Sequence, residues 1–159
     1  MLTSNESHTL HPASYLIWHR QVPANVTILA WRLLRNRLPT KDNLVVHDII
    51  SHDAQLCVNG CGKAETAQHL FITYNKFQDL WYLVRDCIGV FTSEPFCISD
   101  HFVQFSHSIG GFLAQRSFMQ LICLTCVWVS WPERNNHLFN HKDNLIDQLL
   151  HNVKIHSYW

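Results

Sequence analysis

CVNGCGKAETAQHLFITY, residues 57–74, carries two cysteines and one histidine at a spacing that a small metal site could use. Cys57 and Cys61 flank Val-Asn-Gly, and His69 follows eight residues after the second cysteine. Asn and Gly tolerate positive φ, so this turn can direct both sulfurs to one point. Zinc favours thiolate and imidazole ligands in tetrahedral sets. Spacing alone leaves open an ordinary turn with two cysteines and a surface histidine. We call residues 57–74 the knuckle segment.

The residues before the knuckle segment predict a helical hairpin. Apolar side chains recur at helical spacing in the first helix, at Ile28, Trp31, Leu34 and Leu38. Val26, Ala30 and Leu33 widen this predicted face. Pro39 is expected to end this helix at about Leu38, because proline cannot continue it. Thr40 then fits the N-cap of a second short helix, TKDNLVVHDII.

The residues after the knuckle segment also predict helices. NKFQDLWYLVRDCIG, residues 75–89, has an i, i+3, i+4, i+7 apolar stripe and a terminal glycine. A short helix is expected over residues 100–107, and a long one from Leu113 to about Trp131. That long helix is apolar around most of its circumference and should be buried, with Pro132 either kinking it or starting a new turn. Residues 145–153 predict a final amphipathic helix, so the fold class is mainly α.

Composition limits the classes of function. With 159 residues, 47% hydrophobic and 15% charged, the chain can build a core. Twelve basic residues balance twelve acidic ones, which argues against a globally basic nucleic-acid binder. The longest apolar run, residues 118–131, is shorter than the roughly 20 residues of a membrane span. Six unevenly spaced cysteines and a start without signal-peptide features predict an intracellular protein, nuclear or cytoplasmic, that is not secreted.

Several ordered motifs carry a family resemblance. WRLLRNRLPTKDNL, CVNGCG, ETAQHLF and the tryptophan of DLW follow one another over about residues 15–90. They resemble the zinc-binding domain found C-terminal to plant reverse transcriptases, in non-LTR retrotransposons and their domesticated or decayed copies. A later stretch, WPERNNHLF, is similar to the W-x-E-R-N-N-x-x-F pattern that follows this domain in such elements.

The resemblance implies a zinc site with Cys57, Cys61 and His69 as ligands. It places the fourth ligand, a cysteine in the family, at position 74, where this chain has Tyr74. A neutral phenol is a poor zinc ligand beside a thiolate, so the site is degenerate. Three routes stay open: water completes the set, Cys87 or His52 supplies the ligand, or no metal is held.

Other residue patterns have both a functional and a purely structural interpretation. Four basic side chains in a stretch without acidic residues are candidates for nucleic-acid contacts: Arg32, Arg35, Arg37 and Lys41. The alternative for them is a solvated helix face. Cys123 and Cys126 form a C-x-x-C inside the most apolar helix, where core packing is expected. Glu65 is the only carboxylate near the knuckle segment that could act as a base, and adjacent aspartates for a polymerase are absent from the sequence, so no enzyme is expected.

These patterns divide the chain into a flexible N-terminus (1–14), the zinc-binding domain (15–90), a linker with a short helix (91–112) and a truncated helical extension (113–159). We predict a non-catalytic zinc-binding module derived from a retrotransposon reverse transcriptase, with weak binding to element RNA or DNA. Neither a membrane nor a small-molecule substrate is expected as a partner. The alternative is a vestigial, metal-free helical protein with a structural or protein-interaction role.

Overall fold

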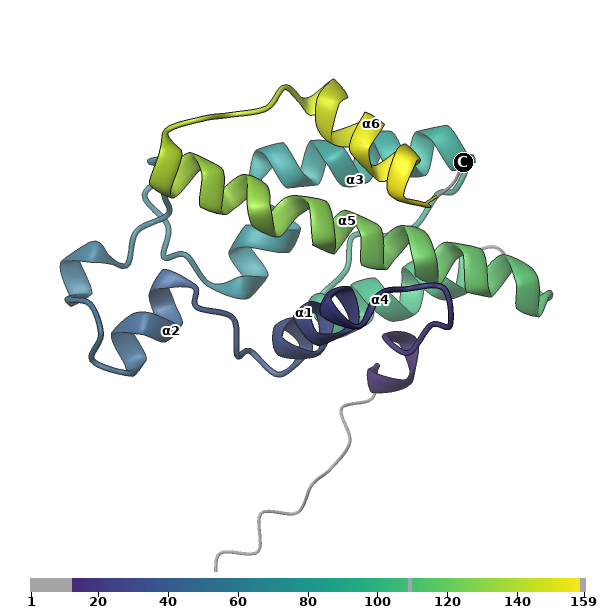
Figure 1. The fold of residues 1–159 in the computed structure, drawn as a ribbon, viewed down its shortest axis with the longest axis horizontal. Coiled ribbons are helices and arrows are strands. Elements are labelled where there is room, and N and C mark those ends of the chain that lie inside the picture. The colour runs from purple at the N-terminus through teal and green to yellow at the C-terminus, as the bar shows by residue number, and fades with distance from the viewer. Residues whose placement is uncertain (1–12, 109, 158–159) are drawn as a thin grey trace, which may run out of the picture.

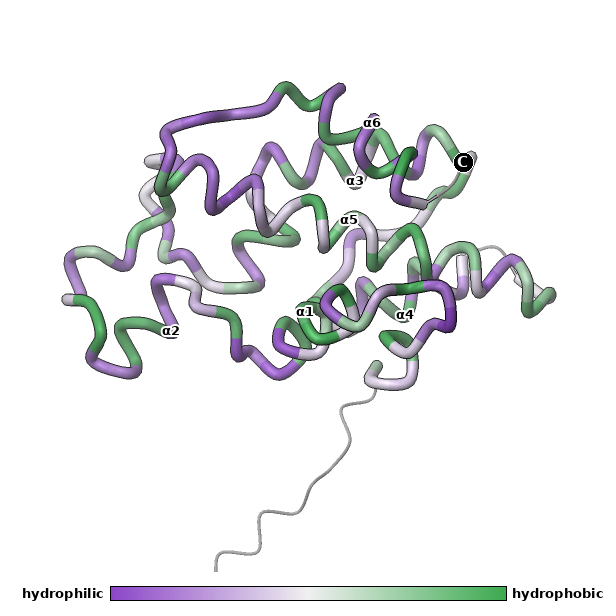
Figure 2. Tube along the Cα trace, viewed as in Figure 1, coloured by the Kyte–Doolittle hydropathy of each residue, from purple (hydrophilic) through white to green (hydrophobic). Residues whose placement is uncertain are grey.

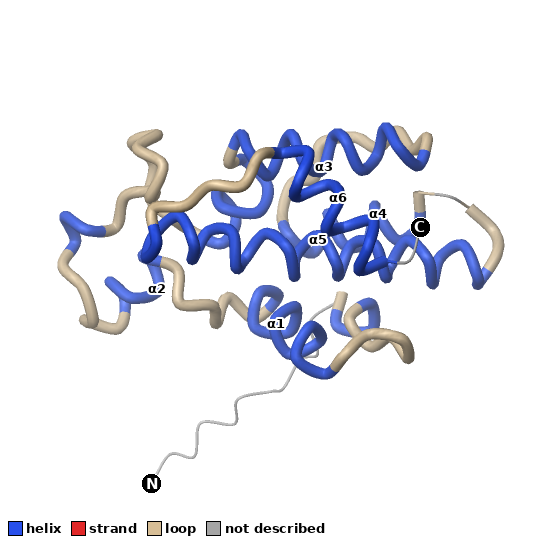
Figure 3. The backbone as a smooth tube through the Cα atoms, turned by 45° about the horizontal axis from the view of Figure 1, so that its top comes forward, coloured by secondary structure: helices blue, strands red, loops and turns tan. Residues whose placement is uncertain are grey.

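The computed structural model describes residues 13–108 and 110–157, and this part of the chain is built from helices without a β-strand (Figures 1 and 3). The α-helices are α1 (Ala24–Leu34), α2 (Lys41–Val46), α3 (Asn75–Ile88), α4 (Ile98–His107), α5 (Leu113–Asn140) and α6 (Ile146–Ser157). Three short turns complete them: the 3-10 turns η1 (Ser14–Leu16) and η2 (His52–Ala54), and the π-helical turn η3 (His69–Thr73). The predicted mainly α fold is confirmed. The predicted N-terminal segment lies almost wholly outside the described residues.

Helix α5 runs through the middle of the molecule, with α3 and α6 on one side and α1 on the other (Figure 1). It packs against α1, α4 and α6, and every residue from 121 to 127 is buried. A helix that is apolar all round needs neighbours on several sides, so the predicted buried helix is confirmed. None of the helices among the described residues is long and apolar enough to cross a membrane. One continuous hydrophobic core takes residues from α1, α3, α4, α5 and α6.

Helix α1 differs from its prediction in length and in one part of its buried face. It ends at Leu34, and Asn36 takes a left-handed conformation with φ of 50°. The Asn43 side chain stabilises this earlier end by donating to the Asn36 carbonyl at 2.9 Å and to the Leu38 carbonyl at 2.8 Å. Most of the predicted face is buried, at Val26, Ala30, Leu33, Leu34 and Leu38, whereas Trp31 is partly buried and Ile28 is 50% exposed. Leu29, outside the predicted face, is buried as well, because tertiary contacts choose among the apolar residues of a helix that is apolar on more than one side.

The start of α2 and the end of α3 follow the sequence closely. The Thr40 side chain accepts the backbone N–H of Asn43, as an N-cap does. Gly89 ends α3 in the left-handed conformation, with φ of 68°. The predicted apolar stripe of α3 is buried: Phe77, Leu80, Trp81 and Val84. These three predictions are confirmed, whereas α2 ends at Val46, earlier than the predicted segment of residues 40–50.

Helix α5 continues through Pro132 to Asn140, well past the predicted end near Trp131. A proline inside a helix removes one backbone hydrogen bond and often ends the helix. Here the next two residues, Glu133 and Arg134, are buried in ion pairs with other segments, which hold this turn in place. His141, with φ of 51°, ends the helix. The hydrophilic segment between α5 and α6 follows (Figure 2).

The first ion pair joins α5 to the knuckle segment. Arg134 donates to Oε1 of Glu65 through Nε at 3.1 Å and through Nη2, and both side chains are buried. The same oxygen accepts the backbone N–H of Lys41 at 3.1 Å, at the start of α2. Glu65 therefore ties α2, the knuckle segment and α5 together.

The second ion pair joins α5 to the start of α3. Lys76 Nζ donates to Glu133 at 2.6 Å, and Glu133 also accepts the backbone and side-chain N–H groups of Asn144 at 2.8 and 2.6 Å. The guanidinium of Arg134 lies 5.1 Å from the ring centre of Trp131. The W-x-E-R residues, 131–134, thus have a structural role, because they hold α5 against Glu65 in the knuckle segment and against Lys76 just after it.

Candidate metal centre

The three predicted ligands come together in space. One ligand atom each from Cys57, Cys61 and His69 lie within 4.8 Å of one another, and Cys61 Sγ is 3.2 Å from His69 Nε2. Two ligands of one tetrahedral zinc ion are about 3.6–3.8 Å apart, given bonds of about 2.3 Å to sulfur and 2.1 Å to nitrogen. The S₂N donor set suits zinc, and small side-chain shifts from separations of 3.2 Å up to 4.8 Å would bring the three atoms to these distances. Such an ion would be held by these three side chains and would supply a structural cross-link.

The backbone of the turn brings the two cysteines together. The backbone N–H of Cys57 donates to the Lys63 carbonyl at 2.8 Å, next to an isolated antiparallel bridge between Leu56 and Ala64. The backbone N–H of Gly60 donates to the Cys57 carbonyl at 3.1 Å, and Gly60 has φ of 69°. An L side chain rarely adopts this conformation, so glycine is needed at the tip. The result is a tight loop whose two sulfurs face the same side.

The two cysteines of the site differ in their exposure to solvent, which affects the pKa of the thiol. Cys57 is buried whereas Cys61 is exposed. Burial raises the pKa of the Cys57 thiol, and hydrogen bonding from Asn59 opposes that rise. A metal cation would favour the thiolate over the thiol, so binding at this site would release protons. The exposed Cys61 leaves one side of the site open to solvent.

The π-helical turn η3 sets the orientation of His69. The Thr73 hydroxyl lies 2.9 Å from His69 Nδ1 and 3.3 Å from the His69 carbonyl oxygen. A hydroxyl that donates to the carbonyl accepts from Nδ1–H, which leaves Nε2 unprotonated and facing the sulfurs. Burial and the charge of Lys63 lower the pKa of His69, which favours the neutral ring that a metal ligand requires.

Tyr74 lies at the edge of this site without joining it. Its ring centre is 6.4 Å from that of His69, and it lines the same cavity as Cys61 and His69. Burial, the acidic side chains and the two thiols raise the pKa of Tyr74 to about 12, so the phenol stays protonated. A neutral phenol does not replace the thiolate that the family pattern places here.

The two alternative protein ligands lie elsewhere. His52 belongs to η2, and Cys87 lies near the end of α3, about 18 Å along the helix axis from its start. Neither joins the ligand cluster found among the described residues. Of the three routes left open by the sequence, water as a fourth ligand and a site without metal are compatible with this arrangement.

The predicted nucleic-acid residues lie at the end of α1 and the start of α2: Arg32, Arg35, Arg37 and Lys41. Arg32 is exposed on the last turn of α1, where a cation also complements the helix dipole. The guanidinium carbons of Arg35 and Arg37 lie 5.8 and 5.5 Å from the ring centre of Trp31. Lys41 donates to the Leu56 carbonyl at 2.9 Å. Within the described ranges none of the four pairs with a carboxylate.

Comparison with protein families agrees with this geometry. The family described as zinc-binding in reverse transcriptase matches residues 1–81, about half of the chain. The chain belongs to the reverse-transcriptase zinc-binding family. The matched residues include all three candidate ligands, Glu65 and the whole of α1 and α2. No curated protein and no solved structure matches the chain.

Some functional residues of this zinc-binding family member were not predicted. Thr73 orients the candidate histidine ligand, and Arg134 partners Glu65 from a segment outside the family match. A signal for Thr73 exists, since it lies four residues after His69 on a helical turn. Cys123 and Cys126 are fully buried in α5, where burial raises both thiol pKa values, which confirms their predicted role in the core.

Proposed function

We propose that this chain is a non-catalytic module, derived from a retrotransposon reverse transcriptase, that binds one zinc ion through Cys57, Cys61 and His69. The observation that carries the proposal is the convergence of these three ligand atoms within 4.8 Å, in a chain of the zinc-binding family. Because Tyr74 is protonated, a water molecule takes the fourth position.

The surroundings of the site favour a structural ion over a catalytic one. A catalytic zinc needs a general base that reaches its bound water. The carboxylate of Glu65 is fully buried and engaged by Arg134 and by the Lys41 backbone, so it is not available as that base. An ion at this site would join the turn at residues 57–61 to the π-helical turn η3, and so stabilise the fold.

Zinc stoichiometry of the purified full chain tests this proposal. Native mass spectrometry is expected to detect one zinc ion per chain, and Cys57→Ser is expected to lose it. Cys87→Ser is the matched control, because Cys87 is an exposed cysteine outside the cluster. If the chain carries no zinc and a chelator leaves its melting temperature unchanged, the metal-free helical protein becomes the correct interpretation.

We further propose weak, sequence-independent binding of RNA or DNA at Arg32, Arg35 and Arg37. The support is the absence of carboxylate partners for these side chains in the described part of the chain, together with the exposure of Arg32 and Arg37. Arginines that neutralise phosphates release counterions, so affinity falls with salt. Lys41, also predicted, already donates to a backbone carbonyl and contributes less.

The salt dependence of binding to a single-stranded oligonucleotide tests this second proposal. Replacing Arg32 and Arg37 by glutamine should reduce the slope of log K against log salt by about 0.7 for each phosphate that is no longer neutralised. Arg116→Gln, at an exposed position on α5, is the control and should leave the slope unchanged. An equal slope in the double variant would remove these residues from the interface.

A further inference from the structure

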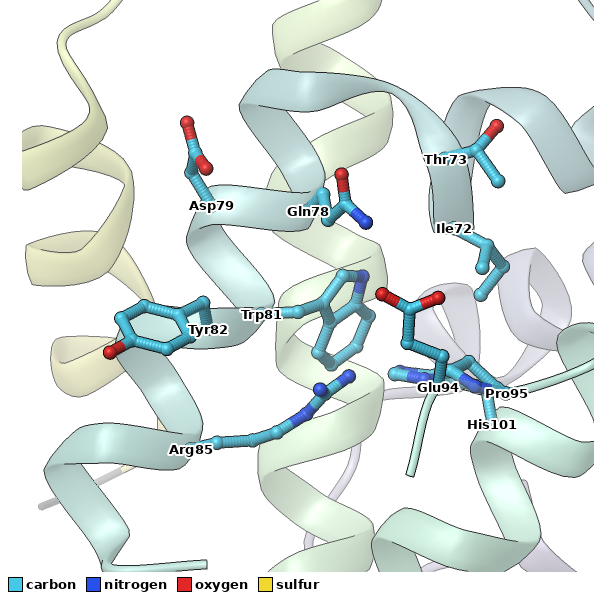
Figure 4. Close-up of a pocket in the computed structure, with 10 residues that line it drawn as sticks. All are labelled: Ile72, Thr73, Gln78, Asp79, Trp81, Tyr82, Arg85, Glu94, Pro95 and His101. Carbon is cyan, nitrogen blue, oxygen red and sulfur yellow. The ribbon is translucent and has the colours of Figure 1, made fainter. Parts of the chain in front are cut away.

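A cavity of about 330 Å³ lies beside α3, away from the three candidate zinc ligands (Figure 4). Its walls come from η3, α3, the segment before α4, and α4 itself. Trp81 forms part of the wall, with its indole N–H held by the Phe71 carbonyl at 2.9 Å. Ile72 and Pro95 add apolar surface. This space is large enough for a small organic molecule.

Arg85 points its guanidinium into this cavity without an acceptor. Figure 4 shows its side chain extending below the ring of Trp81. Among the described residues Arg85 has no hydrogen-bond acceptor and no ion pair, and its Nε is buried without a partner. Burial lowers the pKa of Arg85, and the negative charge of Glu94 opposes that fall. The buried Nε–H still lacks an acceptor, and an anion inside the cavity would supply one.

His101 supplies a second unsatisfied group in the same cavity. The side chain is only 3% exposed, and its Nε2 is buried without a hydrogen-bond partner. Its ring packs edge-on against Trp81, with ring centres 4.1 Å apart, so its position is fixed. Burial, and the nearby charge of Arg85, lower the pKa of His101 to about 3. The ring is therefore neutral at pH 7, and a neutral imidazole can donate one N–H to an oxyanion.

Two acidic side chains restrict the kind of anion. Glu94 and Asp79 also line the cavity, and both are exposed residues. Glu94 lies beside Trp81 and His101 in Figure 4, near enough to Arg85 for its charge to raise the pKa of the guanidinium. A fixed negative charge at the rim repels a dianion more strongly than a monoanion. The apolar wall formed by Trp81, Ile72 and Pro95 favours a ligand that has an apolar body as well as a charged group.

We propose that this cavity binds a small monocarboxylate with an apolar body, held by Arg85 and His101 at its carboxylate and by Trp81 at its apolar part. The guanidinium of Arg85 donates to the carboxylate, and His101 Nε2–H donates to one of its oxygens. Glu94 at the rim disfavours doubly charged ligands. This site is independent of the zinc proposal, although Thr73 and Asp79 border both cavities.

Calorimetric titration of the full chain with benzoate tests the proposal, with acetate and inorganic phosphate as comparison ligands. Benzoate is expected to bind with one molecule per chain, more tightly than acetate and phosphate. Binding of phosphate as tight as that of benzoate would overturn the assignment to a monocarboxylate. Binding of acetate equal to that of benzoate would overturn the role of the apolar wall. No saturable binding of benzoate would overturn the site itself.

Two substitutions with opposite expected effects separate binding from folding. Arg85→Gln should weaken benzoate binding about tenfold or more, since a hydrogen-bonded charge is lost. Glu94→Gln, at an exposed position, should strengthen it about two- to fivefold, because it removes a repulsion of surface magnitude. A Glu94→Gln affinity equal to or below that of the wild type would contradict the proposal even if Arg85→Gln failed to fold.

Benzoate could also reach an open zinc position, so the titration needs one more variant. Cys61→Ser removes a candidate metal ligand and leaves the residues of this cavity unchanged. Benzoate binding should be the same in Cys61→Ser as in the wild type. Loss of benzoate binding in Cys61→Ser would move the ligand to the zinc site and overturn the proposal, without bearing on whether zinc itself is bound.

Discussion

Arg134→Met removes the cation that neutralises the buried carboxylate of Glu65, and we expect it to lower the free energy of unfolding by about 3–5 kcal/mol. The side chains of Glu65 and Arg134 are 0% and 3% exposed, so water does not replace the missing partner. Among the described residues, only the backbone N–H of Lys41 would still donate to the carboxylate. A single neutral donor is too little for a buried charge.

Removing both charges should restore most of the stability. In Glu65→Gln/Arg134→Met neither side chain carries a charge, and the glutamine carbonyl can still accept from the Lys41 backbone. Buried ion pairs replaced by neutral or apolar groups of similar size are often near neutral in stability. We therefore expect the double variant to lose no more than about 2 kcal/mol, and the two single effects to be strongly non-additive.

Urea unfolding of the wild type, both single variants and the double variant gives the coupling energy from one thermodynamic cycle. Arg116→Met is the control, since Arg116 is an exposed arginine on the same helix and should change stability by less than about 0.5 kcal/mol. An Arg134→Met effect as small as that of Arg116→Met would refute the reasoning. Additive single effects would refute it as well, because they would show that Glu65 and Arg134 do not depend on each other.

Three further predictions concern the candidate metal site and α4. Tyr74→Cys should raise zinc affinity at least about tenfold in a chelator competition, because it supplies the missing thiolate, and no gain would remove position 74 from the ligand set. Thr73→Val should weaken zinc binding about tenfold by releasing His69, with Thr73→Ser as the conservative control that keeps the hydroxyl. The folded-state pKa of His101, about 3, is below the unfolded value of 6.5, so the unfolded chain binds more protons in that window. The stability contributed by the neutral, buried His101 is fully present above pH 6.5. Below pH 6.5 the free energy of unfolding should fall by up to about 1.4 kcal/mol per pH unit. This fall should be less steep in His101→Phe than in the His156→Phe control.

Much of the helical fold could be predicted from local patterns. The N-cap at Thr40, the buried stripe of α3 and the stop at Gly89 each depend on residues within one or two turns of each other. The end of α1 could not be predicted from Pro39 alone, because the side-chain amide of Asn43, on the following helix, stabilises an earlier turn. Pro132 failed as a helix end for a related reason, since ion pairs with other segments hold the turn that follows it.

The candidate metal site also has a part that local sequence predicts and a part that only the tertiary structure decides. Residue types and spacing were enough to name two thiols and one imidazole as ligands, because their chemistry is a property of the side chains themselves. Whether Cys87 or His52 could reach them was a question of distance, and the path of α3 and the position of η2 answer it.

Periodicity, capping residues and ligand chemistry are written in short stretches of this chain, so the helices and the metal-binding motif can be recognised from the order of the amino acids. The pairing of Glu65 with Arg134 joins residues 69 positions apart, and no local pattern specifies such a contact. The cavity with Arg85 and His101 likewise exists only because α3 and α4 pack together, which buries Arg85 Nε and His101 Nε2 without hydrogen-bond partners. Burial and long-range proximity are properties of the packed chain, since each depends on which surfaces exclude water.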